Sequence, residues 1–304
     1  MYSVIYMGTP DFAVPCLRGL ADAGAGIRLV VTQPDKPVGR KQILTPSAVK
    51  AAATELGLEI YQPNTLKSDE AYERLRACDA DFIVVAAYGK ILPPRVLALP
   101  RIAPVNVHGS LLPHLRGAAP IQRAVINGDK TSGITTMLMG EGLDTGDILL
   151  QQETPVGESE TAGELFDRLA AMSPALLLKT LDGLVAGEIK PVPQDDSAAD
   201  YAAMLSKEEA VISADADSET VFNQIRGMNP WPIAYTEFEG KKFKIYSCEK
   251  TQMENPDGRT GLRAVGGKLY YACRDRLLLL TKIQAEGGKP MSGDAFLRGH
   301  AVSP

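Results

Sequence analysis

The sequence predicts an α/β fold: a doubly wound, mostly parallel Rossmann-like sheet with a C-terminal OB-like β-barrel domain. Three features of the 304 residues predict it. Apolar, β-prone segments alternate with segments of helical spacing over the first two thirds, which is typical of a parallel sheet with right-handed crossovers. The segment at 81–89 is almost continuously apolar, as a parallel strand covered on both faces requires. After Lys207, short strand-like runs separated by turn residues indicate a small antiparallel barrel.

Three strands and three helices are expected before residue 90. Asp11 is the expected N-cap of the first helix, with Pro15 in its first turn. Gly57 is expected to end the second helix. The strands are expected at 3–8, 27–33 and 81–89, and the helices at 12–23, 47–57 and 69–78.

The same alternation continues towards residue 188. Thr161 and Glu164 form a capping box that opens a long helix. Further strands are expected at 103–110 and 133–139, and a helix near 119–127. Active sites in open parallel sheets lie beyond the carboxyl ends of the strands. The strand ends that matter are therefore Gly8, Gly89 and His108.

The length predicts two domains, at roughly 150 residues each. We expect a catalytic domain at 1–188, a polar, proline-bearing linker at 189–206 and a β-barrel domain at 207–304. Within the last of these, a short helix near 217–227 precedes the strands. Turn residues such as Gly266 and Gly267 separate the strands.

The composition, 45% hydrophobic and 23% charged, excludes disordered and fibrous classes of protein. No run approaches the roughly 20 apolar residues of a membrane span, and the N-terminus does not resemble a secretory signal. We expect a cytoplasmic monomer that binds no membrane. Four scattered cysteines and three histidines predict no metal site. The net charge of −5 requires any contact with nucleic acid to come from local basic patches.

The most informative polar residues lie near the end of the strand at 103–110. Asn106 and His108 are two residues apart, so both side chains project from the same face. An amide N–H and an imidazole aimed at one point are suited to stabilise a developing oxyanion. Glycines around Asp144 allow a turn that returns its carboxylate to the strand ends. Together the three residues favour direct acyl transfer to an amine, since no serine or cysteine nucleophile has a paired base.

Each of these signals is weak when taken alone. A single histidine at a strand end is more often structural, and a turn such as DTGD at 144–147 is more often only a turn. Their co-occurrence favours the catalytic interpretation.

Longer motifs then identify a resemblance. In order along the chain, they strongly resemble the methionyl-tRNA formyltransferase family, and the resemblance covers nearly all of the sequence. The motifs are MGTPDFAVP at 7–15, TQPDKPVGR at 32–40, VVAAYGKILP at 84–93, NVHGSLLPHLRGAAPIQRAVINGD at 106–129, GLDTGDIL at 142–149, SKEEA at 206–210 and NPWP at 229–232. The HGSLLP core alone is shared with other formyltetrahydrofolate enzymes.

The resemblance implies transfer of a formyl group from 10-formyltetrahydrofolate to the α-amino group of methionine on initiator methionyl-tRNA. Carried over by position, it implies that the catalytic residues are Asn106, His108 and Asp144. The residues implied for folate binding are Ser110, Leu111, Leu112 and Pro113, with Tyr88 and Gly89 lining the pocket.

The loop at 34–45 matches the family's segment that enters the acceptor end of the tRNA. Its charges favour this role, because Lys36, Arg40 and Lys41 stand against one acid, Asp35, on a long Pro/Gly-rich insertion. The β-barrel domain would supply a second tRNA surface. Its candidate residues are Lys207, Arg226, Lys241, Lys242 and Lys244.

Three alternatives remain. A formyltransferase acting on a sugar nucleotide or on glycinamide ribonucleotide would keep the Asn, His and Asp but lack the basic loop and the barrel. An RNA-binding protein with an inactive catalytic domain is disfavoured by the intact trio. A nicotinamide oxidoreductase is disfavoured because Met7-Gly8-Thr9-Pro10 replaces the expected G-x-G-x-x-G.

Overall fold

A computed structural model describes residues 2–39 and 42–303, and the chain divides into two compact units. Unit 1 comprises Met1–Gly117, Ser132–Thr154 and Phe166–Tyr201. Unit 2 comprises Ala118–Thr131, Pro155–Leu165 and Ala202–Pro304. Two short segments, Ala118–Thr131 and Pro155–Leu165, thus belong to the same unit as the C-terminal region.

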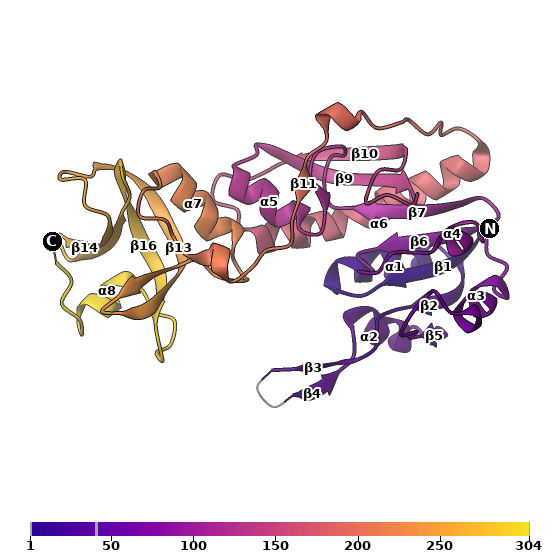
Figure 1. Cartoon of the computed structure of the whole chain (residues 1–304), viewed down its shortest axis with the longest axis horizontal. Coiled ribbons are helices and arrows are strands. Elements are labelled where there is room, and N and C mark those ends of the chain that lie inside the picture. Colours follow the sequence, from indigo (N-terminus) through magenta and orange to yellow (C-terminus); the bar gives the residue numbers. More distant parts are fainter. Residues whose placement is uncertain (1, 40–41, 304) are drawn as a thin grey trace. The chain divides into compact units, whose positions relative to one another are not determined.

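Unit 1 is built on a seven-stranded sheet with the order β10-β9-β7-β6-β1-β2-β5, drawn in Figure 1. Neighbouring strands from β5 to β7 run parallel, and β9 pairs antiparallel with β7. This confirms the Rossmann-like, mostly parallel sheet. The strands are β1 (Ser3–Gly8), β2 (Gly26–Val31), β5 (Ile60–Tyr61), β6 (Phe82–Ala86), β7 (Ala103–His108), β9 (Thr131–Leu138) and β10 (Ile148–Pro155).

The order of the strands determines where a ligand fits. From central β1 the chain proceeds to β2 and β5 on one side, and then to β6 and β7 on the other. In such sheets the crevice lies at the carboxyl ends of the strands where this direction reverses. Gly8 ends β1 there, and an added Cβ would lie 2.7 Å from the Cβ of Ala13 and 3.0 Å from the carbonyl oxygen of Ala86. Only glycine allows this close approach.

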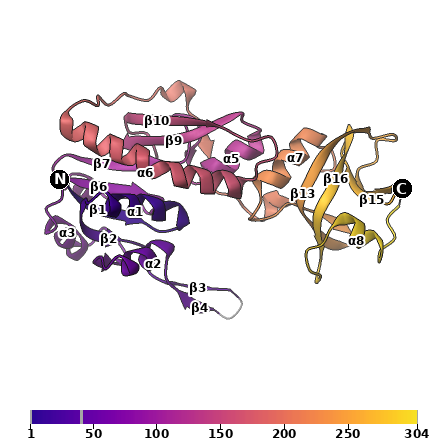
Figure 2. The ribbon, with the colours of Figure 1, turned by 180° about the vertical axis from the view of Figure 1, so that it is seen from behind.

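Helices cover both faces of the sheet. On one face α1 packs against α6, where Cys16 Sγ lies 3.0 Å from Ser173 Oγ and Gly19 faces Pro174 (Figure 2). On the other face, Ile5, Met7 and Ile83 share a buried cluster with residues of α3 and α4. The segments are η1 (Asp11–Ala13), α1 (Val14–Asp22), α2 (Ala48–Glu55), α3 (Asp69–Arg76), α4 (Pro94–Leu97) and α6 (Ala162–Ala186).

One of these helices, α6, is long and apolar enough to cross a membrane by length and composition alone. The same test is passed by core helices of soluble proteins. Leu169, Leu177 and Leu181 of α6 are fully buried, and the Thr180 hydroxyl lies 2.8 Å from that of Thr136 in β9. These contacts assign α6 to the core of unit 1.

The helix ends follow the predicted capping in part. Thr161 and Glu164 form the predicted reciprocal capping box. Gly57 follows α2 with a φ of 65°, which is typical of a helix end. The prediction of Asp11 as N-cap was wrong, because a 3₁₀ turn begins at Asp11 and Ala13 is the N-cap of α1.

Unit 2 contains a curled five-stranded antiparallel sheet with the order β12-β13-β16-β15-β14. The 14-residue β13 has three register irregularities against β16, and bulges of this kind bend a strand. The elements are α5 (Pro120–Asn127), η3 (Glu208–Ala210), α7 (Ser218–Gly227), β12 (Tyr235–Phe238), β13 (Lys241–Glu254), β14 (Gly261–Val265), β15 (Lys268–Ala272), β16 (Arg276–Ala285) and α8 (Gly293–Leu297).

The core of this sheet is formed by its strands together with α7 and α8. Phe243 and Phe296 are buried with their ring centroids 5.0 Å apart, and Phe222 and Ile225 of α7 join the same cluster. The Gly266-Gly267 turn has positive φ at both residues, as a tight hairpin between β14 and β15 requires. The short antiparallel strands expected after Lys207 are present as β12 to β16.

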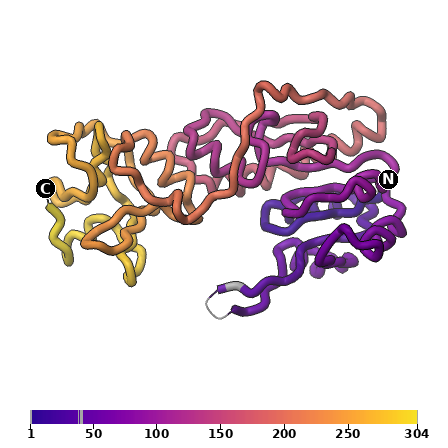
Figure 3. Tube along the Cα trace, viewed as in Figure 1, coloured from indigo at the N-terminus to yellow at the C-terminus, as the bar shows by residue number. Residues whose placement is uncertain are grey.

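The predicted loop at 34–45 is a two-stranded hairpin, of β3 (Lys36–Val38) and β4 (Ile43–Thr45), that extends away from the sheet of unit 1 (Figure 3). Its side chains at Ile43 and Leu44 are exposed. Short segments β8 (Arg116–Gly117), η2 (Asp196–Ala198) and β11 (Tyr201–Ala202) complete the chain.

Candidate functional site

The carboxyl end of β7 carries the two predicted polar residues. Asn106 and His108 are 8% and 6% exposed, and their register places Asn106 opposite Val85 of β6 and His108 opposite Thr135 of β9. Two residues apart on one strand, they share a face of the sheet. Within the described ranges, the Asn106 side-chain amide makes no hydrogen bond. Its N–H donors therefore remain available to a ligand.

His108 has a different partner on each ring nitrogen. Its Nε2 lies 2.9 Å from the carbonyl oxygen of Leu115, and its Nδ1 lies 3.7 Å from Asp144 Oδ2. A carbonyl oxygen only accepts, so Nε2 carries a proton in this arrangement. The Asp144 carboxylate faces Nδ1 on the opposite side of the ring. The ring is thus held between an acceptor and an acid.

Asp144 reaches His108 from the loop between β9 and β10. Its φ of 54° is left-handed, so the aspartate itself makes the turn that the flanking glycines were expected to make. The Gly117 amide donates to Asp144 Oδ2 over 2.8 Å, which fixes the carboxylate towards His108. The Asp144 side chain is only 13% exposed. The predicted catalytic trio therefore lies together at the end of β7 and the adjoining loop.

Gly146 constrains the same loop. A Cβ at this position would overlap the carbonyl oxygen of Leu138 in β9. We expect Gly146→Ala to displace the loop, lowering the free energy of unfolding by about 1–3 kcal/mol and reducing activity. Denaturant unfolding and turnover measure both effects. Gly140→Ala is the matched control, because nothing lies within 4 Å of its added Cβ. Equal stability and activity of the two variants would contradict the prediction.

Two side chains that were not predicted from the sequence hold the backbone of the predicted folate segment, Ser110–Pro113. Thr135 Oγ1 donates to the carbonyl of Ser110 over 2.7 Å and accepts from the amide of Leu112 over 3.1 Å. Gln151 Nε2 donates to the carbonyl of Leu112 over 2.9 Å. The Leu112-Pro113 peptide is cis. Leu111 and Pro113 are partly exposed, whereas Ser110 and Leu112 are buried.

Tyr88 and Gly89 lie after β6 at the same edge of the sheet. The Tyr88 ring is 1% exposed, and burial raises the pKa of Tyr88 to about 12. Its hydroxyl has no hydrogen-bond partner within the described ranges. The Tyr88 carbonyl accepts from Thr9 Oγ1 and from Gln33 Nε2. The Tyr88 ring therefore belongs to the core of unit 1, and its carbonyl is already engaged by two donors.

The base of the β3–β4 hairpin is anchored by hydrogen bonds. Lys36 Nζ donates to Gln33 Oε1 over 2.8 Å. Hydrogen bonds from Gln62 and Lys50 lower the pKa of the Asp35 carboxyl, which stays charged. Lys36 is therefore engaged with its own hairpin. Arg40 and Lys41, the other predicted tRNA contacts, lie outside the described residues.

Arg226 was a candidate for the second tRNA surface, and that prediction was wrong. Its side chain is 7% exposed and donates to Asn223 Oδ1 and to the carbonyls of Gly157 and Glu160. Lys207, Lys241 and Lys242 are exposed, and Lys244 is partly so. Among the described residues, no group of three or more His, Cys, Asp or Glu side chains is placed to hold a metal ion.

Known proteins resemble this chain over nearly its whole length. Residues 2–181 match the formyl transferase family model, and residues 204–301 match the formyl transferase C-terminal domain. The chain is 44% identical to the methionyl-tRNA formyltransferase of Macrococcus caseolyticus, over 98% of this chain and 96% of that protein. The chain is 40% identical to the Bacillus velezensis methionyl-tRNA formyltransferase, over 100% of this chain and 96% of that protein. The chain belongs to the methionyl-tRNA formyltransferase family.

Solved structures share the fold at lower identity. The N-formyltransferase from Helicobacter canadensis, in complex with folinic acid and dTDP-3-aminofucose, has a TM-score of 0.68 and 16% identity, covering 94% of this chain and 100% of that chain. HypX from Aquifex aeolicus, in complex with tetrahydrofolic acid, has a TM-score of 0.62 and 15% identity. The match covers 98% of this chain and 47% of that chain. At these identities the similarity concerns the fold alone.

Proposed function

We propose that the protein transfers the formyl group of 10-formyltetrahydrofolate to the α-amino group of methionine on initiator methionyl-tRNA. The observation that supports this most directly is the placement of Asn106, His108 and Asp144 at one strand end. His108 lies 3.7 Å from the Asp144 carboxylate there. Family membership supplies the donor and the acceptor. The geometry supplies groups suited to an acyl transfer that needs no covalent intermediate.

The proposed reaction is a direct attack. The neutral α-amino nitrogen, with a pKa of about 7.7–8.0 in its free form, bonds to the formyl carbon. The carbonyl oxygen becomes an oxyanion, which the Asn106 amide and the protonated His108 ring stabilise. The Asp144 carboxylate faces the Nδ1 side of the ring. The bond from the formyl carbon to the folate N10 then breaks, N10 takes the proton lost by the amine, and tetrahydrofolate leaves.

The folate donor is proposed to lie along Ser110–Pro113 beside Tyr88 and Gly89. Thr135 and Gln151 fix the backbone of the first segment, and Gln33 that of the second. Fixed backbone groups at the carboxyl edge of a parallel sheet can hold the pterin without reorganisation. No metal is needed for this chemistry.

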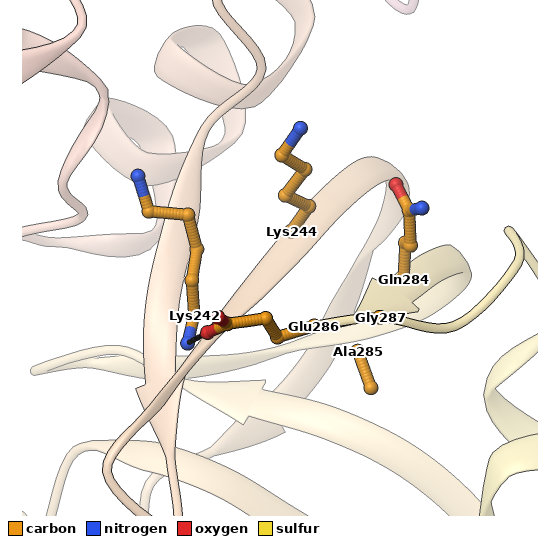
Figure 4. A pocket seen from close by; sticks show the side chains of 6 residues that line it. All are labelled: Lys242, Lys244, Gln284, Ala285, Glu286 and Gly287. Atoms are coloured by element: carbon orange, nitrogen blue, oxygen red, sulfur yellow. Dashed lines mark hydrogen bonds between the residues drawn. The ribbon is translucent and has the colours of Figure 1, made fainter.

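For the tRNA we propose the β3–β4 hairpin, with Lys36, Arg40 and Lys41, and a surface in the C-terminal sheet. Residues 1–188 would thus carry the donor chemistry and the hairpin, and residues 207–304 would carry the second tRNA surface on an OB-like barrel. The C-terminal surface has a pocket of about 360 Å³. Figure 4 shows the amines of Lys242 and Lys244 pointing away from Glu286, which instead accepts from the Lys242 backbone amide. The Lys242 amine lies 3.6 Å from the centre of the Tyr235 ring.

Removing these two amines tests the second surface. We expect the Lys242→Ala, Lys244→Ala double variant to bind initiator tRNA more weakly, with the salt slope of log affinity reduced by about 1–2, because each lysine would neutralise one phosphate. Binding titrations at several salt concentrations measure the slope. The exposed pair Lys67 and Lys179 in unit 1, replaced in the same way, is the control. A slope equal to that of the wild type would remove Lys242 and Lys244 from the interface.

The activity itself is tested by incubating the protein with 10-formyltetrahydrofolate and charged initiator tRNA. The expected product is N-formylmethionyl-tRNA, detected as formylmethionine after hydrolysis of its ester bond. Free methionine and an amino-sugar nucleotide serve as competing acceptors. Formylation of the sugar nucleotide but not of the tRNA would overturn the proposal in favour of the related class of sugar formyltransferases.

A further inference from the structure

The segment expected to be only a linker makes close contacts with the candidate site. After α6 the chain pairs with the edge strand β10, where Val192 and Ile148 exchange two backbone hydrogen bonds of 2.8 and 2.9 Å. The following residues, up to Asp200, reach both loops that carry the partners of His108. Val192–Asp200 form a segment named here the site strap. All of these contacts lie within unit 1.

Gln194 of the site strap holds the loop that carries Asp144. Its Nε2 donates to the carbonyls of Asp144 and Gly146, over 2.8 and 2.7 Å. Its Oε1 accepts from Nε and Nη2 of Arg116, over 3.0 and 2.9 Å. Every donor and acceptor of the Gln194 amide group is thus directed at the site loops, which fixes its orientation.

Arg116 connects this bridge to the second loop. Its side chain is 2% exposed and also donates to Asp196 Oδ1 over 2.8 Å. A guanidinium so deeply buried requires several acceptors, and the site strap supplies them through Gln194 and Asp196. Arg116 directly precedes Gly117, whose amide holds the Asp144 carboxylate. The strap therefore fixes both the backbone and the side chain of Asp144.

The other end of the site strap holds Leu115, whose carbonyl is the partner of His108 Nε2. Asp200 accepts from the Leu115 amide and from His114 Nδ1, and its carbonyl accepts from the Arg116 amide over 3.0 Å. Leu115 has a φ of 60° and offers its carbonyl to His108 Nε2. A non-glycine residue in this conformation is strained, so the surrounding contacts must hold it there.

We propose that Gln194 is a positioning residue for formyl transfer. It holds the left-handed turn at Asp144 so that the Asp144 carboxylate stays beside His108 Nδ1. The proposal rests on the proposed function. Asp144 touches His108 only if its turn keeps a conformation that non-glycine residues rarely adopt. Without the Gln194 amide, the carbonyls of Asp144 and Gly146 lose their donor and the turn can relax. A shift of about 1 Å in a catalytic group is enough to cost roughly 100-fold in rate.

The experiment compares two glutamines that make the same kind of contact. Gln224 Nε2 also donates to two backbone carbonyls, those of Glu209 and Val211, but in unit 2. We expect Gln194→Ala to lower kcat by about 10–100-fold. The KM values for the folate and the tRNA stay within about 3-fold, as is expected when only transition-state stabilisation is lost. Gln224→Ala should retain the kcat of the wild type, and both variants should be folded by circular dichroism.

Two further variants separate positioning from a merely structural role. Gln194→Glu keeps the acceptor for Arg116 but cannot donate to the carbonyls of Asp144 and Gly146, so it should be as slow as Gln194→Ala. In the Asp144→Asn background, Gln194→Ala should cause less than about a 2-fold further loss, because both changes act through the same carboxylate.

The outcomes are distinct. A Gln194→Ala enzyme with the kcat of the wild type, full activity of Gln194→Glu, or losses that multiply in the double variant would each overturn the positioning role. If Gln194→Ala does not fold, the double-variant comparison is made with Gln194→Glu. A folded wild-type protein that formylates no methionyl-tRNA would instead refute the proposed function, before any variant is compared.

Discussion

Replacement of His108 by alanine is expected to lower kcat for formyl transfer by about 1000-fold. The structure places the imidazole on the same strand face as the Asn106 amide and next to the Asp144 carboxylate. In the proposed reaction this ring helps to stabilise the developing oxyanion. Single-turnover formylation with saturating folate and tRNA measures the effect, because it excludes product release.

Binding separates this role from a structural one. The affinity for initiator tRNA should stay within about 3-fold of the wild type, since the ring acts in the transition state. His300 gives the matched control: it stacks on Phe296 in unit 2, and His300→Ala should keep the catalytic rate. If tRNA affinity and rate fell in parallel in His108→Ala, the assignment of His108 to the chemistry would be wrong.

Much of the fold follows from local patterns. The uninterrupted apolar runs predicted β1 and β6, which are buried along their whole length. The capping box at Thr161 predicted the start of α6, because both of its hydrogen bonds lie within one turn. These signals need no partner from elsewhere in the chain. By contrast, β10 and β14 have no clear alternation and become strands through their neighbours in the sheets.

The candidate site divides in the same way. Asn106, His108 and Asp144 stand out because strand spacing and a glycine-rich turn are visible in the sequence. Gln194 and Asp200 do not, since a polar, proline-bearing segment has the same composition whether it is exposed or hydrogen-bonded to a site 50 residues away. Arg226 was misassigned for a related reason: its burial depends on the carbonyls of Gly157 and Glu160, which only the tertiary structure brings to it.

Removing the charge of Asp144 tests the other half of the catalytic pair. Asp144→Asn keeps the size of the side chain and an oxygen that can accept from the Gly117 amide, so the turn should survive. The neutral amide no longer presents a negative charge 3.7 Å from His108 Nδ1. We therefore expect kcat to fall by about 100–1000-fold, with unfolding in denaturant unchanged within about 1 kcal/mol.

Glu141 provides the control for this change of charge. It is an exposed acid three residues earlier in the same loop, and Glu141→Gln removes the same unit of charge. A long-range effect of net charge on the negatively charged tRNA would act on both variants alike and would disappear at high salt. A local effect through His108 would be confined to Asp144→Asn and persist at high salt, because the Asp144 and His108 side chains are only 13% and 7% exposed. Equal kcat values for the two variants would show that the Asp144 carboxylate takes no part in the transfer.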